Sequence, residues 1–149
     1  MDDVVKGFTA GFIATLVVTA MMTIKARMGL APGLDVISLL AELVAAPGQP
    51  LYGWLAHFAV GMVVWGGLFA LASDLVPGPY IAKGISFGVA GWLLMMFLFF
   101  PLAGHSVFGS DLGGMVAVVS FGLNMIFGLA LGVTYHGLQS VDCRAENSN

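Results

Sequence analysis

Four long stretches of uncharged, mostly apolar residues divide the chain. They comprise 18 residues between Lys6 and Lys25, 31 between Glu42 and Asp74, 27 between Lys83 and Asp111, and 30 between Asp111 and Asp142. A transmembrane helix needs about 20 predominantly apolar residues, and strands of a membrane barrel would alternate polar and apolar positions, which these stretches do not. Trimmed at their Pro and Gly turns, they predict an all-α fold with four transmembrane helices, near 5–27, 51–73, 82–103 and 113–137. All four belong to a single domain, 1–149, that ends in a polar tail, 139–149.

The segment 35–46 is apolar but too short to cross a membrane. Asp35, Ser38 and Glu42 share one helical face by their i, i+3, i+7 spacing, and apolar residues cover most of the remainder. One Pro-Gly pair precedes the segment and another follows it. The pattern predicts a short helix that lies in the membrane interface. A cap packed over the helical bundle is an alternative that does not exclude the first.

Composition supports a bilayer as the solvent. The chain is 59% hydrophobic and 9% charged, whereas soluble domains carry about 45–50% apolar and about 25% charged residues. Its five Lys and Arg and net charge of −3 provide no surface for nucleic acid. One Cys excludes a disulfide framework and a Cys-based zinc site. We therefore expect a multi-pass membrane protein with lipid as a partner and with no metal and no cofactor.

The few basic residues predict an orientation. If both termini lie on one side, that side carries Lys6, Lys83 and Arg144, and the other side carries Lys25 and Arg27. Cytoplasmic loops are enriched in Lys and Arg. The balance favours cytoplasmic termini.

The two halves of the chain share a spacing pattern. Spans one and three begin with Lys-Gly and carry a second Gly four residues later, and spans two and four share a polar residue followed by Gly four residues on. The corresponding pairs are Lys6 and Lys83, Gly7 and Gly84, Gly11 and Gly88, His57 and Asn124, and Gly61 and Gly128. The pattern predicts two repeated helical hairpins related by an axis along the membrane normal. The first hairpin is longer by about the length of the interfacial segment.

Small residues recur at intervals of four along the spans. The series are Gly7-Gly11-Thr15-Thr19-Thr23, Gly53-His57-Gly61-Trp65, Gly84-Gly88 and Ser120-Asn124-Gly128-Gly132. Helices associate in lipid through close backbone approach at small residues and through interhelical hydrogen bonds. We therefore expect these stripes to be the buried, helix-packing faces of a tight bundle.

Two polar residues, His57 and Asn124, fall on these packing faces. A polar side chain inside the membrane is a candidate functional residue, and it can equally be an interhelical hydrogen bond that fixes the register of two helices. Thr15 and Thr19 line a polar path in one interpretation. In the other they bond back to carbonyls of their own helix.

The loop before the fourth span carries His105 and Asp111. A metal site formed by His57, His105 and Asp111 has no supporting ligand spacing, and Asp111 is better interpreted as the N-cap of the fourth span. No nucleophile-base pair, carboxylate pair or phosphate loop is present in the sequence. We therefore do not expect an enzyme.

Several motifs resemble those of a known family. They are Lys6-Gly7-x-x-Ala10-Gly11, His57-Phe58-x-x-Gly61-x-x-x-Trp65-Gly66, Lys83-Gly84-x-x-Phe87-Gly88 and Pro101-Leu102-Ala103-Gly104. They resemble an uncharacterised bacterial family of small four-helix inner-membrane proteins, a domain of unknown function distantly similar to the YagU-like proteins. The resemblance implies a four-helix fold in the inner (cytoplasmic) membrane and no defined activity. Members of that family carry His where this chain has Asn124.

Three functions agree with these features. The first is a non-catalytic membrane protein that acts as a packing or accessory subunit of a homo-oligomer or a larger membrane-protein complex. The second is a small channel or transporter with a path between the repeat halves. The third is a redox or quinone-binding membrane unit that uses His57.

Overall fold

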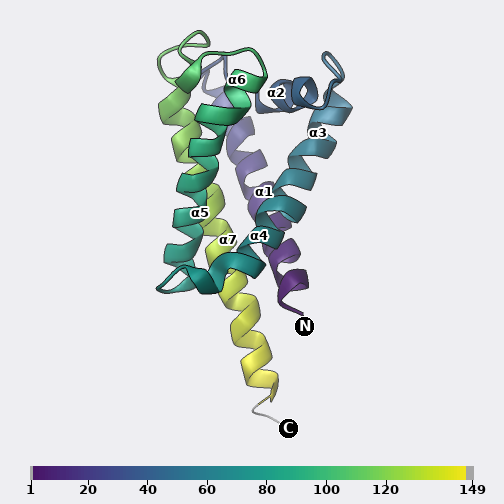
Figure 1. The fold of residues 1–149 in the computed structure, drawn as a ribbon, viewed down its shortest axis with the longest axis vertical. Helices are drawn as coiled ribbons and strands as arrows, with labels where there is room; N and C mark the ends of the chain where they lie inside the picture. The colour runs from purple at the N-terminus through teal and green to yellow at the C-terminus, as the bar shows by residue number, and fades with distance from the viewer. Residues whose placement is uncertain (1, 147–149) are drawn as a thin grey trace.

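The computed structural model describes residues 2–146, with side chains to residue 144, and is built from helices (Figure 1). The first span is α1 (Asp3–Arg27), and the short helix α2 (Val36–Leu43) follows it. The second span joins α3 (Pro50–Ala59), the π-helical segment η1 (Val60–Gly66), α4 (Gly67–Ala72) and the 3₁₀ turn η2 (Ser73–Leu75). The third joins α5 (Tyr80–Leu94), the π-helical segment η3 (Met95–Phe99) and α6 (Phe100–Leu102). After the 3₁₀ turn η4 (Val107–Gly109), α7 (Val116–Glu146) forms the fourth span.

Four helical rods are long and apolar enough to cross a membrane. They are Asp3–Arg27, Pro50–Leu75, Tyr80–Leu102 and Val116–Arg144. At most 33% of the most apolar stretch of each rod is buried inside the protein, so most of its apolar side chains face outward. This all-helical, four-span architecture was predicted from the hydrophobic pattern and is confirmed.

The order of packing places α1 and α7 in the middle of the molecule. Helix α1 contacts α7 on one side and η1 and α4 on the other, and α5 packs along α7. In Figure 1 the two ends of the chain lie at the same end of the bundle, and α2 lies across the opposite end, where it packs on α3. The Asp35 side chain accepts hydrogen bonds from the backbone of Ile37 and Ser38 and so caps α2.

Both hairpins cross at glycines. A Cβ atom on Gly7 would overlap the backbone of Gly66. A Cβ atom on Gly84 would overlap the backbone of Gly128 and of Gly132. Gly11 and Gly88, which were predicted together with these positions as packing residues, also lie at a crossing: Gly11 abuts Gly61, and Gly88 abuts Asn124. Since these glycines are already in contact within one chain, they do not by themselves argue for a partner.

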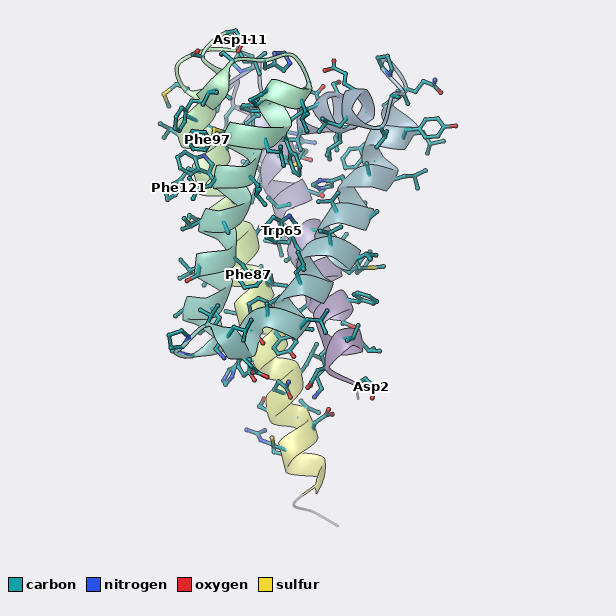
Figure 2. The ribbon with its side chains drawn as sticks, viewed as in Figure 1. Asp2, Trp65, Phe87, Phe97, Asp111 and Phe121 are labelled. Atoms are coloured by element: carbon teal, nitrogen blue, oxygen red, sulfur yellow. The ribbon has the colours of Figure 1, made fainter. Side chains whose placement is uncertain are left out.

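The π-helical segment η1 changes which residues of the second span face α1. Gly11 meets both Gly61 and Gly66, two residues that are five positions apart and share a face because a π turn takes about one residue more than an α turn. The predicted stripe continues from Gly61 to Trp65. Trp65 contacts α5, where its ring lies 6.2 Å from that of Phe87 (Figure 2).

The fourth span also differs from its predicted limits. Helix α7 begins at Val116 rather than near 113, because Gly113 has φ +127°, outside the helical range. It continues through 139–146, part of the predicted polar tail, while 147–149 lie outside the described residues. Polar contacts with α1 hold this extension: Lys6 Nζ lies 2.8 Å from Asp142 Oδ2 and donates to Gln139 Oε1 at 2.8 Å.

Candidate functional site

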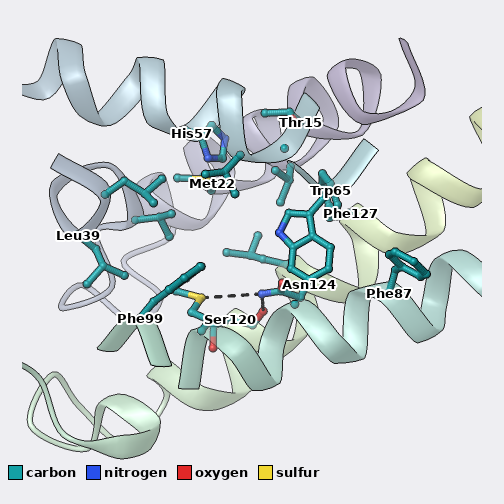
Figure 3. A pocket seen from close by; sticks show the side chains of 18 residues that line it. Thr15, Met22, Leu39, His57, Trp65, Phe87, Phe99, Ser120, Asn124 and Phe127 are labelled. Atoms are coloured by element: carbon teal, nitrogen blue, oxygen red, sulfur yellow. Dashed lines mark hydrogen bonds between the residues drawn. The ribbon is translucent and has the colours of Figure 1, made fainter. Parts of the chain in front are cut away.

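A cavity of about 120 Å³ lies between the two hairpins, near the α2 end of the bundle (Figure 3). All four spans and α2 contribute to its wall. The labelled residues in Figure 3 are Thr15, Met22, Leu39, His57, Trp65, Phe87, Phe99, Ser120, Asn124 and Phe127. The wall is mostly apolar, and its aromatic members come from the second, third and fourth spans.

The two π-helical segments face each other across this cavity. Val60, Gly61 and Trp65 of η1 line one side, and Met95 and Phe99 of η3 line the other. π-Helical turns inside α-helices occur frequently at functional sites. The two π-helical segments therefore lie at the apolar cavity between the hairpins.

His57 lies on the cavity wall and is 9% exposed. Its Nε2 lies 3.1 Å from Thr19 Oγ1, and the Thr19 hydroxyl donates its hydrogen to the Thr15 carbonyl at 2.7 Å. Thr19 Oγ1 therefore accepts from His57, so a neutral imidazole carries its hydrogen on Nε2. The predicted interhelical hydrogen bond is confirmed. Nδ1 is left as an acceptor, without a hydrogen-bond partner among the described residues.

The glycines on either side of His57 shape its surroundings. Gly53 lies against the Ile37 carbonyl of α2, and Gly61 lies against Thr15 Oγ1 of α1. Neighbouring helices therefore approach the second span closely both above and below the imidazole. The ring is held at a three-helix contact rather than directed into lipid.

The threonines of α1 follow the simpler of their two interpretations. Thr15 donates to the Gly11 carbonyl at 2.7 Å, Thr19 to Thr15, and Thr23 to Thr19 at 3.1 Å. Each hydroxyl hydrogen is thus used inside the helix. The three hydroxyl oxygens can therefore accept hydrogen bonds from neighbouring groups but have no hydrogen left to donate.

Asn124 lies on the cavity wall opposite His57, on α7 (Figure 3). Its Nδ2 donates to the Ser120 carbonyl at 2.9 Å and faces Met95 Sδ at 3.9 Å. Its Oδ1 has no donor among the described residues, and it lies beside Gly91, where a Cβ atom would come within 3.0 Å of it. The missing side chain at Gly91 therefore leaves the amide oxygen open to the cavity.

His105 and Asp111 form a separate cluster in the loop between α6 and α7. Asp111 Oδ2 lies 2.8 Å from His105 Nδ1, and Asp111 Oδ1 accepts from the Ser106 amide at 2.9 Å and from the Ser106 hydroxyl at 2.5 Å. These hydrogen bonds, those from Ser106 first, hold the pKa of Asp111 well below its usual range. The predicted N-cap role is wrong, because α7 begins five residues later and the carboxylate is used to fix the loop.

The three residues weighed as a metal site are not brought together. His57 lies in the cavity and His105 and Asp111 in the loop. Within residues 2–146, no group of three or more His, Cys, Asp or Glu side chains is placed to hold a metal ion. In the loop cluster, the Ser106 hydroxyl donates to Asp111, and His105 bonds the other oxygen of the same carboxylate.

Sequence reasoning missed the aromatic and methionine side of the cavity. Pro101 is the signal that was available for η3, because a proline ring in a helix clashes with the carbonyl of the residue four positions earlier, here Phe97. A π-helical widening just before Pro101 relieves that clash. No comparable signal marks η1, apart from the five-residue spacing of Gly61 and Gly66.

Residues 1–145 match the family of unknown function DUF6789. The chain belongs to this family. The predicted membership of an uncharacterised family is confirmed, and the likeness to YagU-like proteins stays a prediction. No curated protein and no solved structure matches the chain. The family assignment therefore carries no activity, and a proposed function must rest on the cavity itself.

Proposed function

We propose that this member of DUF6789 is a non-catalytic membrane protein that binds a lipid-soluble small molecule in the cavity between its two helical hairpins. The observation that carries the proposal is an apolar cavity at the depth of the transmembrane helices, with His57 and Asn124 on opposite walls. Binding sites are typically apolar concavities with a small number of placed polar groups. An engineered apolar cavity of about 150 Å³ binds benzene. The cavity of about 120 Å³ in this protein is therefore close to the size that one aromatic ring needs.

The packing of the spans supports entry from the bilayer. Spans two and three do not pack backbone to backbone along the cavity, because α1 and α7 lie between them. Spans two and three meet below it through Phe87, whose ring lies 6.2 Å from that of Trp65 and 5.0 Å from that of Phe69. Beyond this contact, side chains of both spans and of α2 line the cavity, and we propose that a ligand enters from the bilayer between spans two and three.

Tryptophan fluorescence tests this function, since Trp65 lines the cavity. In a variant that keeps Trp65 as its single tryptophan, bromobenzene added to the detergent micelles should quench the fluorescence saturably. Val60→Phe fills the cavity from η1 and should abolish the saturable component. Val64→Phe is the matched control, because Val64 lies on the same segment but is 47% exposed. Linear quenching that is equal in all three proteins would refute the proposed function.

A path for a transported solute is the second candidate, favoured by the place of the cavity between the halves. No Asp, Glu, Lys or Arg lines it among the described residues, and charged side chains commonly mark ion pathways in membranes. A binding role is therefore the simpler use of the same cavity. Uptake of a bromobenzene-sized aromatic solute by vesicles containing the protein, against vesicles with Val60→Phe, would separate transport from binding.

The remaining features of the proposal concern assembly and placement. We place the protein in a bacterial inner membrane with cytoplasmic termini, and we propose that its two hairpins derive from a repeat. The glycine crossings support the repeat, since Gly7 and Gly11 on one side and Gly84 and Gly88 on the other each abut the partner helix of their own hairpin. A role as an accessory subunit of a homo-oligomer or larger complex is compatible with a ligand-binding cavity, and native mass of the purified protein measures it.

A further inference from the structure

The hydrogen-bonding groups on the cavity wall are mostly acceptors. The hydroxyls of Thr15 and Ser120 donate to carbonyls of their own helices, at 2.7 Å and 3.0 Å. Both amide hydrogens of Asn124 are directed at Ser120 and Met95. What remains is an imidazole nitrogen and an amide oxygen, each able only to accept.

One donor balances these acceptors. The indole Nε1–H of Trp65 has no hydrogen-bond partner among the described residues, and Figure 3 shows the ring among the side chains that line the cavity, which also include His57 and Asn124. In the part of the chain that the structure describes, no side-chain nitrogen or oxygen is fully enclosed without a partner. The free positions of His57, Asn124 and Trp65 therefore keep accessible surface, where a ligand can reach them.

We infer that the ligand is a hydroxyl-bearing aromatic molecule, a phenol or hydroquinone with an apolar tail. This inference rests on the proposed function and specifies its ligand. A hydroxyl donates one hydrogen, to His57 Nδ1 or Asn124 Oδ1, and accepts one from Trp65 Nε1. A ketone, quinone or ether can only accept, so it leaves both wall acceptors unpaired in an apolar site, which is costly.

The aromatic part of the inference comes from the shape and the lining of the cavity. Rings of Trp65, Phe87, Phe99 and Phe127 line it from three different spans. Aromatic rings pack preferentially edge-to-face or offset against one another. The volume of about 120 Å³ accommodates one ring, and the tail would follow the opening between spans two and three into the bilayer.

Matched probes test the ligand class: 4-butylphenol, its methyl ether 4-butylanisole, and 4-butylcyclohexanol. Affinity is measured from the recovery of Trp65 fluorescence as each probe displaces bromobenzene. The concentration of each probe is expressed as its mole fraction in the detergent micelles. The phenol should bind about fivefold more tightly than the ether, as one net hydrogen bond gives, and more tightly than the cyclohexanol. The preference over the ether should fall to about one in His57→Phe or in Asn124→Leu. It should persist in His136→Phe, the same chemical change at an exposed position near the end of α7.

Each outcome has a defined consequence. Equal affinity for phenol and ether in the unaltered protein overturns the inference, as does a preference that survives in both cavity variants. Equal or tighter binding of the cyclohexanol overturns its aromatic part. Failure of all three probes to displace bromobenzene, together with unsaturable quenching, refutes the proposed function instead. The melting temperature of each cavity variant shows whether it is folded. If one of the two variants does not fold, the other still tests the inference.

Discussion

Replacement of Gly84 by alanine tests the glycine crossing between α5 and α7. A Cβ atom at Gly84 would lie 2.8 Å from Gly132 Cα and would also overlap the carbonyl oxygen of Gly128. Both neighbours are backbone atoms, so no side-chain rotation relieves the overlap and the helices must separate. A separation of about 0.5–1 Å forfeits a quarter to a half of the dispersion energy across the contact.

The expected cost follows from two opposing effects. Overpacking costs about 1–3 kcal/mol, and replacement of a helical glycine by alanine returns up to about 1 kcal/mol. With the full gain returned, we expect Gly84→Ala to lower the free energy of unfolding by up to about 2 kcal/mol. Gly122→Ala in α7 is the matched control, because nothing lies within 4 Å of its added Cβ atom. It should be neutral or more stable by up to about 1 kcal/mol.

Reversible unfolding in mixed micelles, with an increasing mole fraction of a denaturing detergent, measures both variants against the unaltered protein. The two substitutions are chemically identical and both lie in membrane-spanning helices, so general effects of alanine cancel in their difference. If the two variants have unfolding free energies within about 0.5 kcal/mol of each other, close backbone approach at Gly84 does not hold this hairpin together.

Two further predictions concern polar contacts. His57→Leu removes the hydrogen bond to Thr19 and should lower the unfolding free energy by about 1 kcal/mol, whereas His57→Asn keeps a donor and an acceptor and should cost less; a His57→Leu protein as stable as the unaltered one would contradict this. The lowered pKa of Asp111 means that its hydrogen bonds stabilise the loop above the usual carboxyl range and are lost only as the pH falls through that lowered pKa. Hydrogen exchange of the Ser106 amide should therefore stay slow through the usual titration range of Asp and should become fast, already at neutral pH, in Asp111→Asn; an amide equally protected in both proteins would show that the carboxylate does not order the loop.

The sequence determined the membrane-spanning architecture because transfer into lipid depends chiefly on each segment's own residues. Each of the four uncharged stretches predicts one membrane-spanning helix independently of the others. The predicted limits of these helices agree with those in the structure within a few residues, except at the fourth span. The glycines at intervals of four predicted which faces pack, since a backbone can approach only where side chains are absent. The partners of those faces were not predictable, because the sequence does not state which helices are neighbours.

Tertiary structure decided the cavity and the roles of its residues. Trp65 lies on the same stripe as His57 and Gly61, and all three line the cavity, which exists only because the four spans and α2 are placed around it. His57 Nδ1 and Asn124 Oδ1 are free acceptors because the Thr19 hydroxyl and the Asn124 amide group donate their hydrogens to backbone carbonyls. The cavity that these acceptors line is formed by side chains that lie within a few ångströms of one another across different helices. Local propensity and hydropathy carry no information at that range, so the ligand-binding properties of this protein follow from its packing and not from any one segment.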